Sequence, residues 1–301
     1  MTKIEQILKN NLKNTNEEFK RIFHGRGNFY GDRYKDITID SIDRIIFISL
    51  YQAINFEDEL ITFIKKLITK TNHTTIALQK RYEKETPTIL IEGILEDEIF
   101  AIEDGIKIKI NLTNNKNNGY FPDMKNGRAF IKEMAKNKNI LNLFSYTCGF
   151  SLFAYAGGAS SVTNVDMNKS VLSTGRENHK INDIDTKNIH FMPYNILKSF
   201  SRIKKNGPYD MIIIDPPSFQ KGSFIASNDY IKIIKKLDLL SKNNTIVLAC
   251  LNAPELNSQF LIDLFKEYAN DFIFKRKLPN LIDFPTNNEE KSLKNLIFIK
   301  K

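Results

Sequence analysis

The chain has 301 residues, enough for one large α/β domain or for a domain of about 180–200 residues with a smaller companion. Its 42% hydrophobic and 26% charged residues are typical of a globular protein and exclude large-scale disorder. Lys and Arg outnumber Asp and Glu by 44 to 35, and this net charge of +9 favours a polyanionic partner such as RNA or DNA. AT-rich coding, which enriches Lys, Asn and Ile, would produce part of the same excess.

Several classes of protein are disfavoured. No apolar run approaches the roughly 20 residues that cross a bilayer, so we expect no membrane role. The first five residues lack the apolar core of a signal peptide, and the only cysteines are Cys148 and Cys250. Both features predict a cytoplasmic protein. The histidines show no metal-ligand spacing, so no metal is expected.

The first third of the chain predicts a small α+β domain, over residues 1–96. Apolar residues from Ile4 to Leu12 indicate a helix, and the capping-box spacing from Thr15 to Glu18 predicts a second one that continues through Phe19 and Ile22. The segment 24–27, His-Gly-Arg-Gly, interrupts it. Short β-branched runs at 37–40, 44–51, 74–82 and 88–95 follow, around one helix at 56–70. A β-hairpin, 99–102 with 106–110, forms a connector over 97–123.

From residue 124 to 301 the pattern predicts a second, larger domain in which strands and helices alternate after an initial helix at 124–136. The expected strands are 139–145, 161–166, 188–193, 209–215 and 245–251, and the expected helices are 150–157, 169–181, 197–204, 228–240 and 256–268. Such alternation implies a parallel sheet with helices on both faces. Two last strands, 271–278 and 293–300, are close enough in sequence for an antiparallel return.

The first strand of this domain runs into a turn, Ser145–Phe150, that opens a helix and holds one glycine, Gly149. In a doubly wound sheet this turn lies where a nucleotide-like ligand binds. The turn is not a GxGxxG loop, so it favours S-adenosylmethionine, which has no phosphates, over NAD or FAD.

The next two strands end in polar side chains. Asp166, followed by Met167 and Asn168, stands about 20 residues after the turn, where a carboxylate can reach ribose hydroxyls. Its alternative role is to cap the helix at 169–181. Asn195, after the third strand, is either a hydrogen-bond partner of the adenine amino group or a plain turn residue.

The fourth strand ends in the most specific signal, Asp215-Pro216-Pro217-Ser218-Phe219. Proline fixes the backbone and cannot extend the ladder, so the chain leaves the sheet stiffly at this point. Such rigid positioning suits methyl transfer, an in-line displacement. The alternative is a structural turn.

Together these segments resemble a known family. The segments 142–147, 164–166, 215–222 and 119–128 are similar to those of bacterial large-subunit (23S) ribosomal RNA methyltransferases that make 5-methylcytosine or 7-methylguanine, over about residues 95–300. Within this family, the chain resembles a branch whose members have an N-terminal His-Gly-Arg-Gly segment and no obvious PUA module. The resemblance implies an α/β fold, a Rossmann-like class I methyltransferase with a seven-stranded mixed sheet, and S-adenosylmethionine as cofactor.

The resemblance also implies that Phe121, Asp123 and Arg128 close over the cofactor. The whole expected cofactor site is Phe121, Asp123, Arg128, Asn142, Ser145, Tyr146, Thr147, Gly149, Asp166, Met167, Asn168, Asn195 and Asp215. Two positions depart from the family: Cys148 replaces a usual glycine and puts a side chain in the turn, and Asn195 replaces a commoner Asp and removes a charge near adenine.

The expected catalytic residues are Asp215, Pro216, Pro217 and Cys250. Family members that make 5-methylcytosine carry a cysteine near the place of Cys250, since carbon 5 becomes nucleophilic only after a thiolate adds at carbon 6. The alternative, which we favour, is that Cys250 is a buried structural thiol. Methylation at nitrogen would need only a proton acceptor and a slot that stacks the base.

Four residues are candidates for contact with the substrate. Phe219 is a stacking candidate or a core residue, and Lys221 a phosphate contact or a solvated side chain. His24 and Arg26 either contact a backbone phosphate from the small domain or are incidental to a tight glycine turn.

The sequence therefore predicts an enzyme that methylates a base of RNA, with ribosomal RNA as partner. Two alternatives stay open: a methyltransferase acting on protein or a small molecule, and a non-catalytic RNA-binding factor that retains the fold. The target atom and the oligomeric state are not determined by the sequence.

Overall fold

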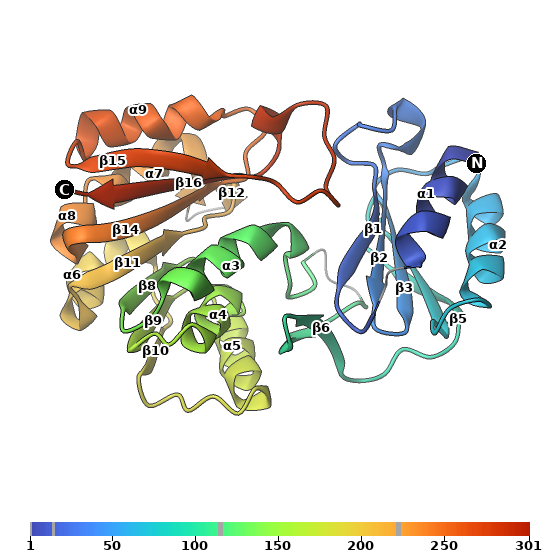
Figure 1. Cartoon of the computed structure of the whole chain (residues 1–301), viewed down its shortest axis with the longest axis horizontal. Coiled ribbons are helices and arrows are strands. Elements are labelled where there is room, and N and C mark those ends of the chain that lie inside the picture. Colours follow the sequence, from blue (N-terminus) through green and yellow to red (C-terminus); the bar gives the residue numbers. More distant parts are fainter. Residues whose placement is uncertain (1, 14–15, 114–116, 221–223) are drawn as a thin grey trace. The chain divides into compact units, whose positions relative to one another are not determined.

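The structure is a computed structural model that describes residues 2–13, 16–113, 117–220 and 224–301. The chain divides into two compact units, shown in Figure 1. Unit 1 comprises Met1–Pro122 and Leu281–Asn287, and unit 2 comprises Asp123–Asn280 and Asn288–Lys301. The expected domain limits at 96/97 and 123/124 stay a prediction.

Unit 1 is built on a five-stranded sheet with the order β1-β2-β3-β4-β5. Its strands are β1 (Lys20–His24), β2 (Ile37–Ile42), β3 (Ile45–Leu50), β4 (Thr75–Lys80) and β5 (Thr88–Glu92). Strands β3 and β4 pair in parallel because α2 (Glu57–Ile68) crosses between them, and the other neighbours are antiparallel. Helices α1 (Thr2–Leu12) and α2 bury their apolar faces in one hydrophobic core with the sheet. Between β1 and β2 lies a short 3₁₀ helix, η1 (Asp32–Tyr34).

The prediction of a second helix through Phe19 and Ile22 is wrong. Asn16 Oδ1 accepts a hydrogen bond from the Glu18 N–H at 3.0 Å, and the chain then enters strand β1, which pairs with β2. The capping-box spacing is a local signal, whereas the strand satisfies its backbone groups and buries Ile22 and Phe23 in the core. Residues 14 and 15 lie outside the described part of the chain.

The predicted hairpin is confirmed as β6 (Ile99–Glu103) and β7 (Ile106–Ile110). Its strand β6 is tied to the start of unit 1, because the Phe19 N–H donates to the Ile102 carbonyl at 2.8 Å.

Unit 2 holds the predicted seven-stranded mixed sheet, with the order β10-β9-β8-β11-β14-β16-β15. Its strands are β8 (Asn139–Leu143), β9 (Ser161–Val165), β10 (Ile189–Met192), β11 (Tyr209–Ile214), β14 (Ser241–Leu251), β15 (Phe272–Leu278) and β16 (Lys294–Lys300). The first five pair in parallel, and β16 returns antiparallel to both β14 and β15. The order reverses at β8, so the carboxyl ends of β8, β9 and β11 flank the point where α/β proteins bind their ligands.

Helices cover both faces of this sheet (Figure 1). On one face lie α3 (Lys125–Met134), α4 (Gly149–Ala156) and α5 (Lys169–Ile181), and on the other α6 (Phe200–Ile203), α7 (Ala226–Ile234), α8 (Leu237–Leu240) and α9 (Ser258–Tyr268). Short 3₁₀ segments are η2 (Pro122–Met124), η3 (Ile196–Lys198), η4 (Lys204–Asn206) and η5 (Glu289–Lys291), and a two-stranded ribbon joins β12 (Phe219–Gln220) to β13 (Phe224–Ile225).

Two predicted helices are interrupted. The helix expected at 197–204 is divided into η3, α6 and η4, and the one at 228–240 into α7 and α8. The helix expected at 169–181 is confirmed at both ends as α5.

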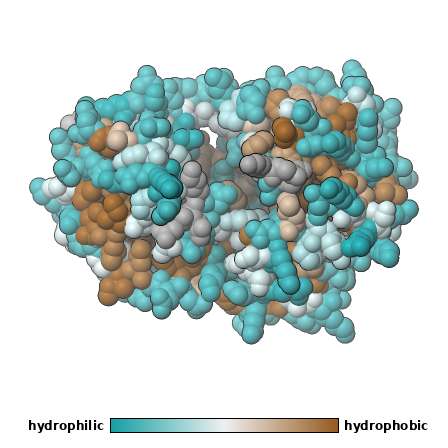
Figure 2. Space-filling view, turned by 180° about the vertical axis from the view of Figure 1, so that it is seen from behind, coloured by the Kyte–Doolittle hydropathy of each residue, from teal (hydrophilic) through white to brown (hydrophobic). Residues whose placement is uncertain are grey.

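Large hydrophobic side chains remain exposed on both units, and Figure 2 shows brown hydrophobic surface among the hydrophilic residues. Examples are Phe29, Ile89, Leu90 and Ile94 in unit 1 and Met167 and Phe219 in unit 2. In the described part of the chain, no helix is long and apolar enough to cross a membrane.

Candidate active site

The turn after β8 has an unusual backbone. Phe144, Tyr146 and Cys148 adopt left-handed conformations with φ of 58°, 48° and 63°, which L-residues rarely adopt. The turn is held by hydrogen bonds from the Ser145 N–H to the Val165 carbonyl at 3.1 Å and from the Cys148 N–H to the Ser145 carbonyl at 2.8 Å. Three such residues within five positions store strain, and such strain gathers at ligand sites.

Cys148, where the family usually has glycine, is fully buried against α5. A β-carbon at Gly175 of α5 would lie 2.5 Å from the Cys148 Sγ, so the absence of a side chain at Gly175 makes the room for this sulfur. Burial holds the pKa of the Cys148 thiol well above its ordinary value, since the charged form would be desolvated. The side chain that we expected to occupy the turn is therefore accommodated by the neighbouring helix.

Asp166 connects the second strand to this turn. Its carboxylate accepts hydrogen bonds from the Tyr146 N–H at 3.0 Å and from the Asn168 N–H at 2.9 Å. Burial raises the pKa of Asp166, and the two backbone donors oppose this rise. The cap of α5 is Asn168, whose side chain accepts from the Ser170 and Val171 N–H groups at 2.9 and 3.4 Å. The capping role that was the alternative for Asp166 thus belongs to Asn168.

A small pocket lies at the carboxyl ends of these strands and brings together Asp166, Met167 and Asn195, three of the expected cofactor residues. It is lined by Phe144, Asp166, Met167, Asn195, Ile196, Leu197 and Gln220. The Oδ1 atom of Asn195 is buried and has no hydrogen-bond partner among the described atoms. A buried acceptor without a donor is costly unless a ligand supplies one. Apolar walls, a carboxylate and an unpaired acceptor fit adenine, a ribose and the adenine amino group of S-adenosylmethionine.

Sequence reasoning did not single out four residues of this pocket: Phe144, Ile196, Leu197 and Gln220. Apolar residues next to strands look like core residues in a sequence. Two of the four had a signal: Phe144 lies between the first strand and the glycine turn, and Gln220 lies within the segment 215–222 that resembles the family.

A second polar cluster surrounds Asp215, which directly follows β11. Burial and, after it, the nearby Asp123 carboxylate raise the pKa of Asp215 to about 7, and the Arg128 guanidinium opposes this rise. Asp123 and Arg128 come from η2 and α3, and Arg128 is 3% exposed with its guanidinium 5.6 Å from the centre of the Phe153 ring. Three residues expected from distant segments, Asp123, Arg128 and Asp215, therefore interact in unit 2.

The two prolines separate the strand end from the ribbon that follows. Pro216 is buried and Pro217 is exposed, while Ser218 Oγ donates to the Asn252 carbonyl after β14. Phe219 is 66% exposed in β12, so it is a surface side chain and its core alternative is wrong. Lys221 lies outside the described residues.

Cys250 lies in β14, with Asn295 of β16 as its antiparallel partner. It is fully buried, and burial together with the carboxylates of Asp215 and Asp123 raises the pKa of its thiol well above the ordinary value. Tyr230 Oη, also buried, lies 3.0 Å from the Cys250 carbonyl, to which it donates, and 3.2 Å from that of Ile214. These surroundings oppose the thiolate that a nucleophile requires. The catalytic role of Cys250 stays a prediction that they do not support.

A buried polar chain leads from the sheet to α5. It begins at Asn142, which was expected at the cofactor, and sequence reasoning missed the other members. Asn142 Nδ2 donates to Asn164 Oδ1 at 2.9 Å, Asn164 Nδ2 to Ser151 Oγ at 3.0 Å, and Ser151 Oγ lies 2.9 Å from His179 Nε2. Burial lowers the pKa of His179 to about 4, so the ring is neutral. Polar residues in apolar strands, Asn142 and Asn164, were the available signal.

The remaining expected residues lie as follows. Ser145 Oγ is buried without a partner among the described atoms, the Thr147 carbonyl accepts from Asn178 Nδ2 at 3.0 Å, and Gly149 begins α4. Phe121 belongs to unit 1 and is 39% exposed. His24 and Arg26 also belong to unit 1. Among the described residues, no group of three His, Cys, Asp or Glu side chains could hold a metal ion.

Comparison with solved structures gives the same fold. The chain matches the crystal structure of SMU.776 complexed with SAH, with a TM-score of 0.85 at 24% identity over 99% of this chain and 81% of that one. It also matches a SAM-dependent methyltransferase from Agrobacterium tumefaciens, with a TM-score of 0.72 at 17% identity over 94% and 90% of the two chains.

Curated relatives are ribosomal RNA methyltransferases by name. The chain is 31% identical to ribosomal RNA large subunit methyltransferase I of Aeromonas salmonicida over 62% of this chain and 49% of the relative. It is 37% identical to methyltransferase K/L of Shewanella sp. strain MR-4 over 50% and 22%. YwbD of Bacillus subtilis, provisionally named in the same way, is 27% identical over 89% and 72%. The chain thus spans about half the length of the methyltransferase I relative, and less of methyltransferase K/L.

A family profile matches most of the chain. Residues 20–299 match the profile of the S-adenosylmethionine-dependent methyltransferases, and this range includes both the turn at 144–149 and the Asp215 strand end. The cofactor of that family is the one that the pocket residues fit. The chain belongs to the S-adenosylmethionine-dependent methyltransferase family.

Proposed function

We propose that this protein transfers a methyl group from S-adenosylmethionine to a base of RNA, and that the RNA is that of the large ribosomal subunit. The observation that carries the proposal is the pocket at the ends of β8, β9 and β10, in which Asp166 and the unpaired Asn195 Oδ1 lie among apolar side chains. The names of the relatives and the net charge of +9 support RNA as the acceptor.

Cofactor binding is proposed to divide between two groups of residues. Asp166 would accept from the ribose hydroxyls and Asn195 from the adenine amino group, with Met167 and Phe144 against the ring. The turn residues Ser145, Tyr146, Thr147 and Gly149, with Asn142, Asn168, Asp123 and Arg128, complete the proposed site in unit 2. When bound, S-adenosylmethionine supplies an electrophilic methyl group on its sulfonium.

Asp215 is the proposed proton acceptor. When a nitrogen that carries hydrogen is methylated, the new N–C bond replaces the S–C bond and the N–H proton must leave. A carboxyl whose pKa is raised to about 7 is poised to hold that proton near neutral pH. Pro216 and Pro217 would fix the strand exit, and the exposed Phe219 would stack on the base.

A carbon target is less well supported. Methylation at carbon 5 of cytosine requires a thiolate, and both the burial of Cys250 and the neighbouring Asp215 and Asp123 oppose its formation. We therefore propose a nitrogen target, with Cys250 as a structural residue.

The rest of the chain is assigned in the same proposal. The N-terminal region, residues 1–96 with the hairpin connector 97–123, would present the RNA, with a contact expected of Arg26. Both cysteines are free and buried, which agrees with a reducing cytoplasm.

The test offers tritiated S-adenosylmethionine with ribosomal RNA, ribosomal subunits and cell protein. Label in RNA is the expected result, and label confined to protein would overturn the proposed acceptor. Calorimetry with the unlabelled cofactor tests the site by itself: Asp166→Ala should weaken binding roughly tenfold or more, because it removes hydrogen bonds to a charged group. Asn182→Ala in the same unit is the control. No binding by the unaltered protein would leave only a non-catalytic role.

A further inference from the structure

The His-Gly-Arg-Gly segment at the end of β1 packs tightly against backbone within unit 1. A β-carbon at Gly25 would lie 1.8 Å from the Tyr34 carbonyl oxygen, and one at Gly27 would lie 2.0 Å from that of Pro285. The Asn287 N–H donates to the Gly27 carbonyl at 3.0 Å. Only glycine permits both approaches, so the two glycines fix the backbone on either side of Arg26.

His24 contributes no charge to this segment. Its Nδ1 accepts a hydrogen bond from the Arg21 guanidinium at 2.7 Å, and its ring lies 4.9 Å from that of Phe284. Burial and the charges of Arg21 and Arg26 lower the pKa of His24 to about 3, so the ring is neutral. Arg21 itself is paired with Asp40 and is only slightly exposed. His24 and Arg21 are therefore structural, and neither is available to a polyanion.

Arg26 is held differently. It is exposed, and its guanidinium lies 4.1 Å from the centre of the Tyr51 ring. The Arg81 guanidinium lies 5.0 Å from the centre of the same ring, and its Nη1 donates to Gln79 Oε1 at 3.3 Å. Tyr51 and Arg81 follow β3 and β4 directly, and the Arg81 N–H donates to the Leu50 carbonyl at 2.8 Å. One aromatic ring thus orients two cations at one end of the sheet.

This arrangement suits phosphate. A guanidinium held over an aromatic ring has lost part of its freedom before binding, and its planar fork of N–H donors matches the geometry of phosphate. Two guanidiniums on one ring repel each other in the free protein, and an anion between or beside them relieves that repulsion. Within the described residues, no carboxylate is paired with Arg26.

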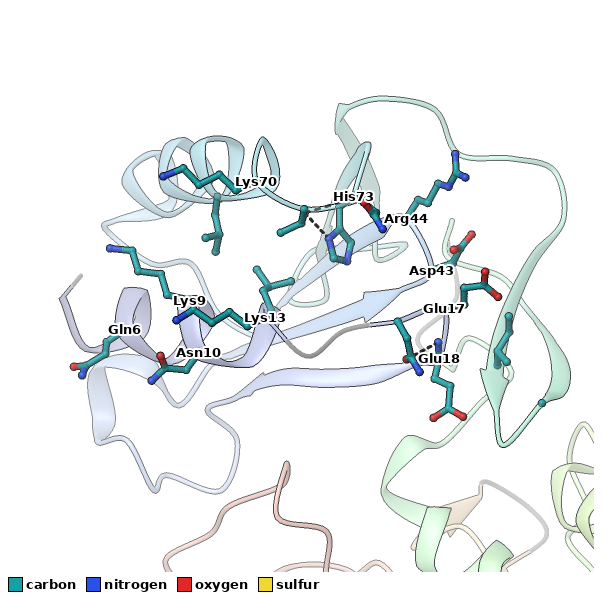
Figure 3. A pocket seen from close by; sticks show the side chains of 17 residues that line it. Gln6, Lys9, Asn10, Lys13, Glu17, Glu18, Asp43, Arg44, Lys70 and His73 are labelled. Carbon is teal, nitrogen blue, oxygen red and sulfur yellow. Dashed lines mark hydrogen bonds between the residues drawn. The ribbon is translucent and has the colours of Figure 1, made fainter.

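The other end of the same sheet holds a larger pocket, of about 1170 Å³, with a different character (Figure 3). Lys9, Lys13 and Lys70 gather on one wall, while Glu17, Glu18 and Asp43 lie on the opposite side. Charges of both signs make this pocket a poorer site for a polyanion. It provides instead a control surface within the same unit.

We propose that Arg26 and Arg81, held on the ring of Tyr51, form a binding site for the phosphodiester backbone of the RNA substrate. The inference rests on the proposed function for the identity of the RNA, and it assigns the contact to three residues of unit 1. It replaces the pair His24 and Arg26 by Arg26 and Arg81.

Filter binding of deproteinised 23S ribosomal RNA across a series of KCl concentrations tests this site. Arg26→Gln and Arg81→Gln should each weaken binding about tenfold, because each removes charge-assisted hydrogen bonds to a phosphate. The double variant should lower the slope of log affinity against log salt by about 1.5, as expected for two lost phosphate contacts. Tyr51→Leu should weaken binding, and Tyr51→Phe, which keeps the ring, should not.

The matched control is Arg44→Gln. Arg44 is an exposed arginine in the β2–β3 turn, at the other end of the sheet, and its change removes the same charge from the same unit. Binding near that of the unaltered protein is expected for Arg44→Gln. Equal weakening by Arg44→Gln and Arg26→Gln would show a general charge effect and overturn the site. Thermal unfolding of each variant, together with binding of S-adenosylmethionine, shows that both units remain folded.

The outcomes separate this site from the proposed function. If the protein methylates RNA and the two arginine variants bind RNA normally, the site is wrong and the function stands. If the variants lose RNA binding although no RNA is methylated, the site stands and the function is wrong. An unaltered protein with no measurable affinity for RNA would overturn both.

Discussion

The raised pKa of Asp215 predicts a pH dependence of stability that one substitution should remove. Folding raises the pKa of this carboxyl from 3.8 to about 7, so between these values the folded protein holds a proton that the unfolded chain releases. Stability therefore falls as the pH rises from about 4 to about 7, and it is level above that. A pKa difference of this size corresponds to at most about 4 kcal/mol, and the partial exposure of Asp215 reduces it.

Asp215→Asn replaces the carboxyl by a group of the same shape that does not titrate. Urea unfolding, followed by circular dichroism at several pH values, gives the free energy of unfolding of both proteins. The difference between them should grow by a few kcal/mol in favour of the variant from pH 4 to pH 7. Any change in stability that the substitution causes equally at every pH does not affect this comparison between pH values.

Asp123→Asn is the control for the cause. Because the Asp123 carboxylate raises the pKa of Asp215, its removal should move the transition toward lower pH without abolishing it. Identical pH dependence of the unaltered protein and Asp215→Asn would refute the reasoning, since it would mean that Asp215 titrates alike in the folded and unfolded states.

Three further substitutions test the site from its packing. Cys250→Ala should leave the rate of methyl transfer undiminished and lower the free energy of unfolding by about 1 kcal/mol. If the variant binds the cofactor but no longer transfers the methyl group, Cys250 is a nucleophile after all. Gly175→Ala should lower the free energy of unfolding in urea by about 1–3 kcal/mol, because the new methyl group would lie 2.5 Å from the Cys148 Sγ. Adding Cys148→Gly should restore the lost stability, and failure to restore it would contradict this packing. Asn168→Ala should cost about 1 kcal/mol by removing the cap of α5, whereas Asn168→Asp should cost little, and equal losses would argue against the cap.

The sequence by itself determined the architecture of unit 2. Alternating strands and helices have one common solution, a parallel sheet covered on both faces. Local residues in the sequence show where three buried strands end: the glycine turn after β8, Asp166 after β9, and Asp215 with its two prolines after β11. These residues lie together because the carboxyl ends of parallel strands meet at the same edge of the sheet.

Local signals failed where pairing with distant segments decided the structure. The segment through Phe19 and Ile22 carries a helix-start pattern, but pairing with β2 makes it a strand. Asp166 and Asn168 are both possible caps by spacing, and only the three-dimensional positions of the Tyr146, Ser170 and Val171 N–H groups assign the cap to Asn168.

Tertiary structure also decided the charge states and the contacts of the candidate site residues. His24 and Arg26 are two residues apart in the sequence, yet their surroundings differ. His24 is neutral, because burial and the charges of Arg21 and Arg26 lower its pKa, whereas Arg26 is exposed and lies over the Tyr51 ring. Asp215 and Cys250 follow the same rule: the sequence placed both at strand ends, and desolvation in the folded chain raises both pKa values.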